Sequence, residues 1–201
     1  MRKISANYLC PIISEPIKNG IIVLNDDNVI VEIKENNQPV NESANVEFYN
    51  GVIVPGFVNT HCHLELSRDN PLKTNGFGLV NFLKEISRLK KNEYPYNLKQ
   101  CVEVDADMFA SGVQAVGDIS NTAFTSGIKN KSKIKYHNFI ELIGIFDNFV
   151  NEVFEKGKLI YDNFYNPKSI TPHTSYSVSP KLFDLINKFS IQNNSIISIH
   201  N

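Results

Sequence analysis

The sequence has few cysteines and no long apolar run. Its 201 residues include only Cys10, Cys62 and Cys101, an odd number without regular spacing. This argues against a disulfide framework and for a reducing compartment. No apolar stretch approaches the roughly 20 residues of a membrane span, and the start of the chain has no cleavage pattern typical of a signal peptide. We therefore expect a cytoplasmic protein without a membrane partner.

The chain also lacks an excess of charge of either sign. With 20 basic and 21 acidic residues, its formal net charge is −1. Such a balance predicts no field that would attract nucleic acid, so we expect no nucleic-acid partner. The lysines are scattered apart from those at 129–135, a pattern typical of a solvated loop. Length and an apolar content of 42% suit one domain, with or without a small satellite.

The first 54 residues have the pattern of short strands joined by turns. Asn25-Asp26-Asp27-Asn28 lies between two apolar runs and predicts a hairpin. Asn50-Gly51 is a strong turn signal after the last of these runs. The expected strands cover residues 4–9, 20–24, 29–33 and 46–49.

Strands and helices alternate in the remainder of the chain. Ser179-Pro180 predicts a helix start, with serine as the N-cap and proline at the first helical position. Such alternation is typical of a parallel sheet. We expect about five strands, fewer than the eight of a (β/α)₈ barrel of about 250 residues. The expected strands begin at residues 53, 113, 134, 169 and 195, and the expected helices cover residues 79–89, 98–110, 149–164 and a segment from 180.

Two histidines one residue apart end the first of these strands. Residues i and i+2 of a strand point to the same face, so His61 and His63 project together and Cys62 points away. Two imidazoles at the end of a buried strand need a shared partner, since each ring is polar. A transition metal is one such partner, and separate hydrogen-bonding partners are the alternative. Cys62 is expected to be a small buried apolar residue.

The stretch Pro55-Gly56-Phe57-Val58-Asn59-Thr60-His61-Cys62-His63 resembles the first-strand signature of the amidohydrolase superfamily. With Leu64-Glu65 after it, the sequence is most similar to the chlorohydrolase and cyclic-deaminase branch, in particular the aminodeoxyfutalosine deaminase-like proteins. The resemblance runs through the whole chain. It implies an α/β fold: residues 1–54 as part of an N-terminal β-sandwich, and residues 55–201 as the first part of a TIM-like (β/α)₈ barrel.

The resemblance also implies a metal site. His61, His63 and His200 match three ligands of the family, whose fourth ligand is an aspartate on strand eight, beyond Asn201. His173 matches a histidine that contacts the substrate. A histidine-rich site with one carboxylate suits Zn²⁺ or Fe²⁺. The family's acid/base glutamate lies three residues after the third histidine, so no catalytic residue is assigned within this chain.

Four other polar residues are open to two interpretations. Glu65 is either a substrate-binding residue or a carboxylate that caps a loop. For Asp118, a cap for the turn that follows its strand is favoured over a role in the site. His137 is expected to be structural or on the surface, and Glu141 is left unassigned.

The resemblance implies a metal-dependent hydrolase that deaminates an amino-substituted heterocycle, such as an aminopurine nucleoside. A chlorohydrolase or an amide-cleaving enzyme shares every motif seen here, and an inactive metal-binding fragment is a further alternative. The expected partner is a small-molecule substrate. An unpaired strand edge at residues 195–200 predicts self-association into a homo-oligomer, or else that the 201 residues are only the ordered portion of a longer protein.

Overall fold

The computed structural model describes residues 1–36, 45–67, 78, 80, 81, 84, 96–165 and 167–201. Two compact units divide the chain, Met1–Gly56 and Phe57–Asn201. The helix predicted over residues 79–89 lies largely outside the described residues. Within the described part of the chain, every helix is too short or too polar to cross a membrane. Helices and strands together confirm the mixed α/β class predicted from the sequence.

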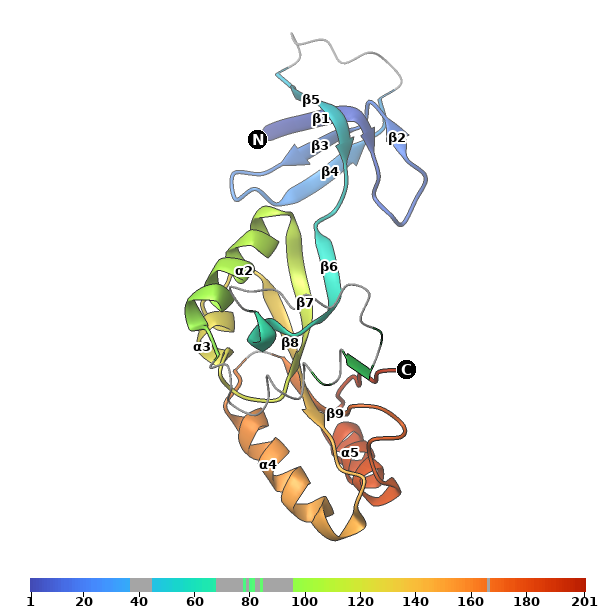
Figure 1. Ribbon diagram of the computed structural model, residues 1–201. Helices are drawn as coiled ribbons and strands as arrows, with labels where there is room; N and C mark the ends of the chain where they lie inside the picture. The colour runs from blue at the N-terminus through green and yellow to red at the C-terminus, as the bar shows by residue number, and fades with distance from the viewer. Residues whose placement is uncertain (37–44, 68–77, 79, 82–83, 85–95, 166) are drawn as a thin grey trace. The chain divides into compact units, whose positions relative to one another are not determined.

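The first unit is one five-stranded sheet (Figure 1). Strand β1 pairs antiparallel with β2 and β3, β3 pairs with β4, and β5 pairs with β1 in parallel. The predicted hairpin joins β3 to β4, because the Asn25 side chain accepts the backbone N–H groups of Asp27 and Val29. The strands are β1 (Arg2–Leu9), β2 (Ile17–Lys18), β3 (Ile21–Leu24), β4 (Ile30–Lys34) and β5 (Glu47–Ile53).

The turn predicted at Asn50-Gly51 is wrong. Both residues lie inside β5, where the register with β1 shifts between Ala6 and Tyr8. Gly51 has a φ of 152°, which L-residues rarely adopt, and its N–H donates to the Asn7 side chain at 2.7 Å. Glycine adopts backbone conformations that other residues avoid. At Gly51 this freedom allows a β-bulge and not a turn.

The second unit is built on a four-stranded parallel sheet in the order β6-β7-β8-β9. The Ser179 side chain caps α5 by accepting the Leu182 N–H at 3.3 Å, as its sequence predicts. The strands are β6 (Phe57–Cys62), β7 (Val113–Ser120), β8 (Lys135–Leu142) and β9 (Lys168–Pro172). The helices are α2 (Leu98–Ala110), α3 (Ser126–Lys129), α4 (Val150–Asp162) and α5 (Pro180–Gln192), with short 3₁₀ turns η2 (Leu64–Leu66) and η3 (Asp147–Phe149).

Two apolar clusters hold the helices to this sheet. One joins β8 and β9 to α4 and α5, around Ile140, Ile170 and Leu182. The other lies around Leu64, Cys101 and Val116 and joins η2 and α2 to β7. Burial of these side chains is the main source of stability for the sheet and its helices. It fixes the carboxyl ends of the four strands, where the polar residues of the site gather.

Residues 195–200 do not form the predicted fifth strand. They make a single parallel bridge, between His200 and Thr174. Pro172 has no N–H to extend a ladder at the end of β9. The Thr171 hydroxyl instead binds the Ser198 backbone, accepting its N–H at 3.0 Å and donating to its carbonyl oxygen.

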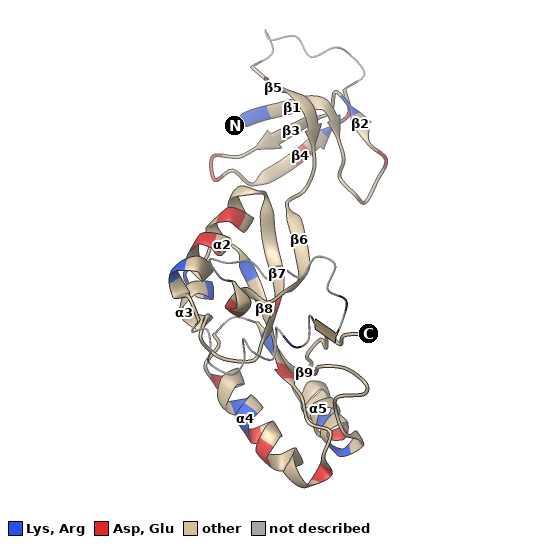
Figure 2. Ribbon diagram, viewed as in Figure 1, with Lys and Arg blue, Asp and Glu red and all other residues tan. Residues whose placement is uncertain are grey.

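Charged side chains of both signs are mixed on the helices of the second unit (Figure 2). On α4, Lys156 pairs with Glu152 at 2.6 Å and Lys158 with Glu155 at 3.3 Å, and these side chains are largely exposed. Exposed pairs of this kind contribute little to stability.

Candidate metal centre

His61 and His63 lie at the carboxyl end of β6. Their ring centroids are 5.1 Å apart. Cys62, between them, packs against the cluster around Leu64 and Val116, as the alternation of a strand predicts. Burial, with Asp118 nearby, raises the pKa of the Cys62 thiol to about 12. The Cys62 thiol is therefore neutral at neutral pH, and the residue is partly buried.

His200 joins this pair from the segment after α5. Its ring centroid lies 4.8 Å from that of His61 and 5.8 Å from that of His63. The His173 carbonyl oxygen holds it in place, accepting the His200 backbone N–H at 2.8 Å and lying 3.1 Å from its Nδ1. The structure thus brings His200 next to His61 and His63, although 139 positions separate His61 from His200 in the chain.

The three imidazoles fit a divalent transition metal. One ligand atom from each lies within 4.8 Å of the others. Two Zn–N bonds of about 2.1 Å span at most about 4.2 Å, so small ring rotations would let all three hold one ion. Burial lowers the pKa of His63, which favours the neutral form that a metal requires. Among the described residues nothing forms a hydrogen bond with the buried Nδ1 of His63.

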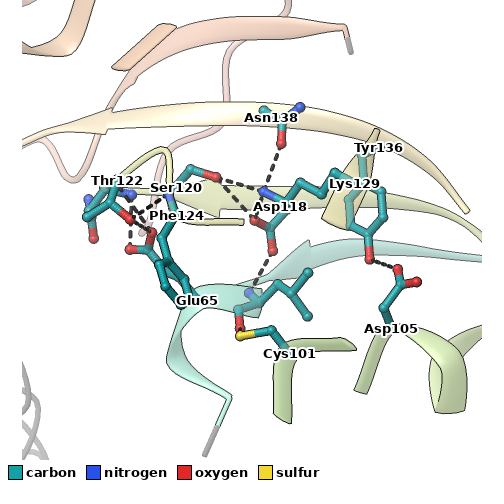
Figure 3. Close-up of polar contacts among 12 residues, drawn as sticks. Glu65, Cys101, Asp105, Asp118, Ser120, Thr122, Phe124, Lys129, Tyr136 and Asn138 are labelled. Carbon is teal, nitrogen blue, oxygen red and sulfur yellow. Dashed lines mark hydrogen bonds and ion pairs between the residues drawn. The ribbon is translucent and has the colours of Figure 1, made fainter. Parts of the chain in front are cut away.

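The turn after His63 is held by a buried charged network (Figure 3). The Asp118 carboxylate accepts the Leu64 N–H at 2.7 Å, and the Cys101 thiol donates to the Leu64 carbonyl oxygen at 3.1 Å. Lys129 donates to Asp118 at 2.5 Å, to Ser120 at 3.0 Å and to Asn138 at 2.8 Å. All three ammonium protons of the lysine are therefore used.

Two expectations from the sequence are wrong here. Lys129 is only 1% exposed, so it does not belong to a solvated loop. Asp118 binds the turn after β6, not the turn after its own strand. Sequence periodicity could not reveal either role, because the Leu64, Asp118 and Lys129 groups that meet here come from three different elements, η2, β7 and α3.

Glu65 lies in this turn, within η2, and is also buried. Its carboxylate accepts the Asn121 N–H and the Thr122 N–H, both at 3.1 Å, and the Thr122 hydroxyl at 2.7 Å (Figure 3). Burial raises the pKa of the Glu65 carboxyl, an effect these hydrogen bonds oppose. The loop-capping alternative accounts for these bonds, and the substrate contact stays a prediction.

His173 and Glu141 lie beside His200. The His173 ring is 4.8 Å from that of His200, centroid to centroid, and its Nδ1 is 2.9 Å from the Ser177 hydroxyl. Glu141, near the end of β8, places Oε1 3.3 Å from His200 Nδ1. The sequence left Glu141 unassigned and gave no signal for Asn121, whose side chain donates to Glu141 at 2.8 Å.

His137 lies at the other end of β8. Its Nε2 is 2.9 Å from the Ser169 hydroxyl on β9, and its ring packs 4.6 Å from that of Phe139. Burial lowers its pKa. It has no place in the cluster formed by the other four histidines, which agrees with the structural role expected from the sequence.

The fold resembles that of several solved enzymes. Helicobacter pylori aminofutalosine deaminase, in complex with methylthio-coformycin, matches all of this chain with 50% of its own, at a TM-score of 0.74 and 19% identity. Guanine deaminase from C. acetobutylicum, with bound guanine, matches 99% of this chain with 52% of its own length, at a TM-score of 0.65 and 16% identity. Atrazine chlorohydrolase from Arthrobacter aurescens, complexed with zinc, matches all of this chain with 52% of its own length, at a TM-score of 0.71 and 14% identity.

These three structures belong to the amidohydrolase superfamily. Over the half of each structure that it matches, this chain has the same fold. The resemblance expected from the Pro55–His63 stretch is thereby confirmed at the level of architecture, and the chain spans about half the length of each structure. No protein-family model and no curated protein sequence matches the chain.

Proposed function

We propose that this chain is the first part of a metal-dependent hydrolase of the amidohydrolase type. The observation that carries the proposal is the convergence of His61, His63 and His200, whose ligand atoms lie within 4.8 Å of one another. Three imidazoles that meet at the carboxyl end of β6 are a typical donor set for Zn²⁺, with Fe²⁺ as the alternative. The first unit would then be part of the family's β-sandwich, and β6–β9 the first strands of its (β/α)₈ barrel.

We propose hydrolytic deamination of an amino-substituted heterocycle as the reaction, with an aminopurine nucleoside as the model substrate. When bound, a divalent metal lowers the pKa of a coordinated water, which makes hydroxide available at neutral pH. His61 and His63 would hold the ion from the end of β6, and His200 from the segment after α5. The solved structures with guanine and with a coformycin derivative support a purine-like substrate.

His173 is the residue we propose for substrate contact. It begins the loop after β9, and such loops form the active-site face of a barrel. Ser177 holds the ring through Nδ1, so the ring presents its other edge at a fixed angle. A ring fixed in this way can donate a hydrogen bond to, or accept one from, a heterocycle bound beside the metal.

Dechlorination is the second candidate reaction. It is favoured by the similarity of fold to atrazine chlorohydrolase, and it needs the same activated water. A panel that includes chlorinated triazines separates it from deamination, because the products are chloride and ammonia respectively.

The test uses the full-length protein that carries this sequence. We expect about one zinc per chain and release of ammonia from at least one aminopurine nucleoside. His61→Ala should lose both metal and activity. His173→Ala should keep the metal and lower turnover about 100-fold, within the range for a positioned acid/base or polarising group.

His137→Gln is the matched control, because this histidine lies outside the cluster; it should change neither metal content nor turnover. The proposal would be overturned by a wild-type protein that binds no divalent metal, or by His61→Ala retaining full activity. Loss of metal in His173→Ala would make His173 a ligand rather than a substrate contact.

A further inference from the structure

Glu141 is a buried acid with one carboxylate oxygen that lacks a hydrogen bond. Its side chain is 3% exposed, and no described donor forms a hydrogen bond with Oε1. Two ring nitrogens face this oxygen, His200 Nδ1 at 3.3 Å and His173 Nε2 at 4.0 Å. A buried carboxylate oxygen without a full hydrogen bond is costly, so its position calls for a physical reason.

The other oxygen of Glu141 is held firmly. Asn121 Nδ2 donates to Oε2 at 2.8 Å. The backbone N–H of Asn121 in turn donates to Glu65 at 3.1 Å, and Glu65 also binds Thr122. A continuous chain of contacts thus runs from Glu65 through Asn121 to Glu141, and it aims Oε1 at His200.

The surroundings of His200 determine which ring nitrogen carries the proton. Nδ1 lies 3.1 Å from the His173 carbonyl oxygen and 3.3 Å from Glu141 Oε1. Both neighbours are acceptors, so the neutral ring is stabilised with its proton on Nδ1. Nε2 then carries the lone pair that a metal requires.

We propose that Glu141 is a positioning residue, which fixes the Nδ1–H form of His200 and so directs Nε2 to an ion shared with His61 and His63. This inference rests on the proposed metal site. It also explains why the residue is a carboxylate. Asn121 Nδ2 and His200 Nδ1 both act as donors towards this side chain, and a glutamine would turn its NH₂ group towards one of them.

Glu141, His173 and His200 are also close enough to hold an ion themselves, with ligand atoms within 4.8 Å of one another. The geometry favours positioning over a second metal site. The His200 nitrogen on this side, Nδ1, already faces the His173 carbonyl oxygen, and an N–H cannot coordinate a metal. The number of zinc ions bound per chain separates these two roles.

The test compares four forms of the full-length protein: wild type, Glu141→Gln, Asn121→Ala and Asp105→Asn. Asp105→Asn is the matched control, because Asp105 binds the Tyr136 hydroxyl at 2.6 Å and Ser132 at 2.7 Å, away from the histidines. Zinc affinity and stoichiometry are measured by competition with a chromophoric chelator. The proton position on His200 is read from ¹⁵N NMR of the histidine rings in zinc-free protein at pH 8.

We expect one zinc per wild-type chain and a 10- to 100-fold weaker affinity in Glu141→Gln, the range for residues that orient metal ligands. His200 should be the Nδ1–H form in wild type and a mixture in Glu141→Gln. Asn121→Ala, which keeps the carboxylate but releases it, should lose less affinity, and it carries the test if Glu141→Gln does not fold. Asp105→Asn should match wild type in both measurements.

The inference is overturned if Glu141→Gln binds zinc as tightly as wild type and His200 keeps Nδ1–H. It is also overturned if wild type binds two zinc ions and Glu141→Gln binds one, because Glu141 is then a ligand. A wild-type protein that binds neither zinc nor another divalent metal refutes the proposed function, while the NMR measurement still tests whether Glu141 sets the proton position.

Discussion

Asp118 and Glu141 are buried acids on neighbouring parallel strands, and their surroundings differ. Asp118, on β7, is fully paired: Lys129, Ser120 and the Leu64 N–H use both its oxygens. Glu141, on β8, has one oxygen held by Asn121 and another that faces two histidine rings without a hydrogen bond. Hydrogen bonds and a cation thus satisfy both oxygens of Asp118, whereas one oxygen of Glu141 has no hydrogen bond among the described residues.

The difference separates a structural acid from a functional one. A buried ion pair with every donor and acceptor used holds a fixed geometry, here the turn that follows His63. A buried carboxylate with an unused oxygen is tolerated where another group has to be oriented, here His200. The comparison therefore predicts that changes around Asp118 affect stability first, and that changes around Glu141 affect metal affinity first.

Removing the cation beside Asp118 would give the largest effect. Lys129→Ala should destabilise the fold by about 3–5 kcal/mol, because it leaves a buried carboxylate without its partner. Urea unfolding of the full-length protein measures this. Lys156→Ala, which breaks an exposed pair with Glu152, is the control and should cost less than about 1 kcal/mol.

The double variant Lys129→Met with Asp118→Asn sharpens the interpretation. It removes both charges, so part of the lost stability should return. If Lys129→Ala unfolds at the same urea concentration as wild type, the ion pair does not stabilise the turn after His63.

Loss of the Glu65 carboxylate should destabilise the fold less than Lys129→Ala does. Within the site, it should affect Glu141, to which Glu65 is linked through Asn121. Glu65→Ala leaves the N–H groups of Asn121 and Thr122 without their acceptor, which typically costs about 1–3 kcal/mol. Because Asn121 holds Glu141, zinc affinity should also fall, by less than in Glu141→Gln. Urea unfolding and chelator competition measure the two effects.

The same variant decides between the two interpretations of Glu65. A loop anchor predicts lower stability with little change in the KM of the best substrate. A direct substrate contact predicts the reverse, a raised KM at nearly unchanged stability.

The smallest effect concerns His137, which lies on the same strand as Glu141 but has no acid beside it among the described residues. Burial lowers its pKa below the ordinary value of 6.5, so the folded protein binds fewer protons here than the unfolded chain does. The contribution of neutral His137 to the free energy of unfolding should be fully present above about pH 6.5 and should fall as the pH drops below that value. His137→Gln should flatten this slope between pH 7 and 5, measured by urea unfolding at each pH. An unchanged slope would mean that other histidines cause it.

Local patterns predicted most of the second unit well. The helix expected at residues 98–110 is α2 with the same bounds, and Ser179-Pro180 begins α5 as predicted. These signals depend on neighbours three or four positions away, so a single sequence contains them. Asn50-Gly51 misled because glycine serves a bulge as readily as a turn. Residues 195–200 misled because an apolar run forms a strand only where a partner backbone is available.

The histidines of the site could be found from their spacing and from the resemblance, and the residues that support them could not. Asp118, Lys129 and Asn121 meet their partners across the strands and loops of a folded sheet. In the sequence they look like a strand-end cap, a surface lysine and a loop asparagine. The register of β6, β7 and β8 places Asp118 beside Cys62 and Asn138, and the loop and helix α3 that follow β7 bring Asn121 and Lys129 to their partners.

The parallel pairing of β1 with β5 has a consequence for the order of folding. During synthesis, β1 can form its antiparallel pairs with β2 and β3 as soon as residue 24 has emerged. Its other edge has no partner until residues 47–53 follow. Closing that pair has a higher contact order than either neighbouring pairing, so it should be the slow step of the first unit. Only Val54, Pro55 and Gly56 separate β5 from β6, so the histidine-bearing strand leaves the ribosome directly after the last strand of the first sheet and before that slow pairing is complete.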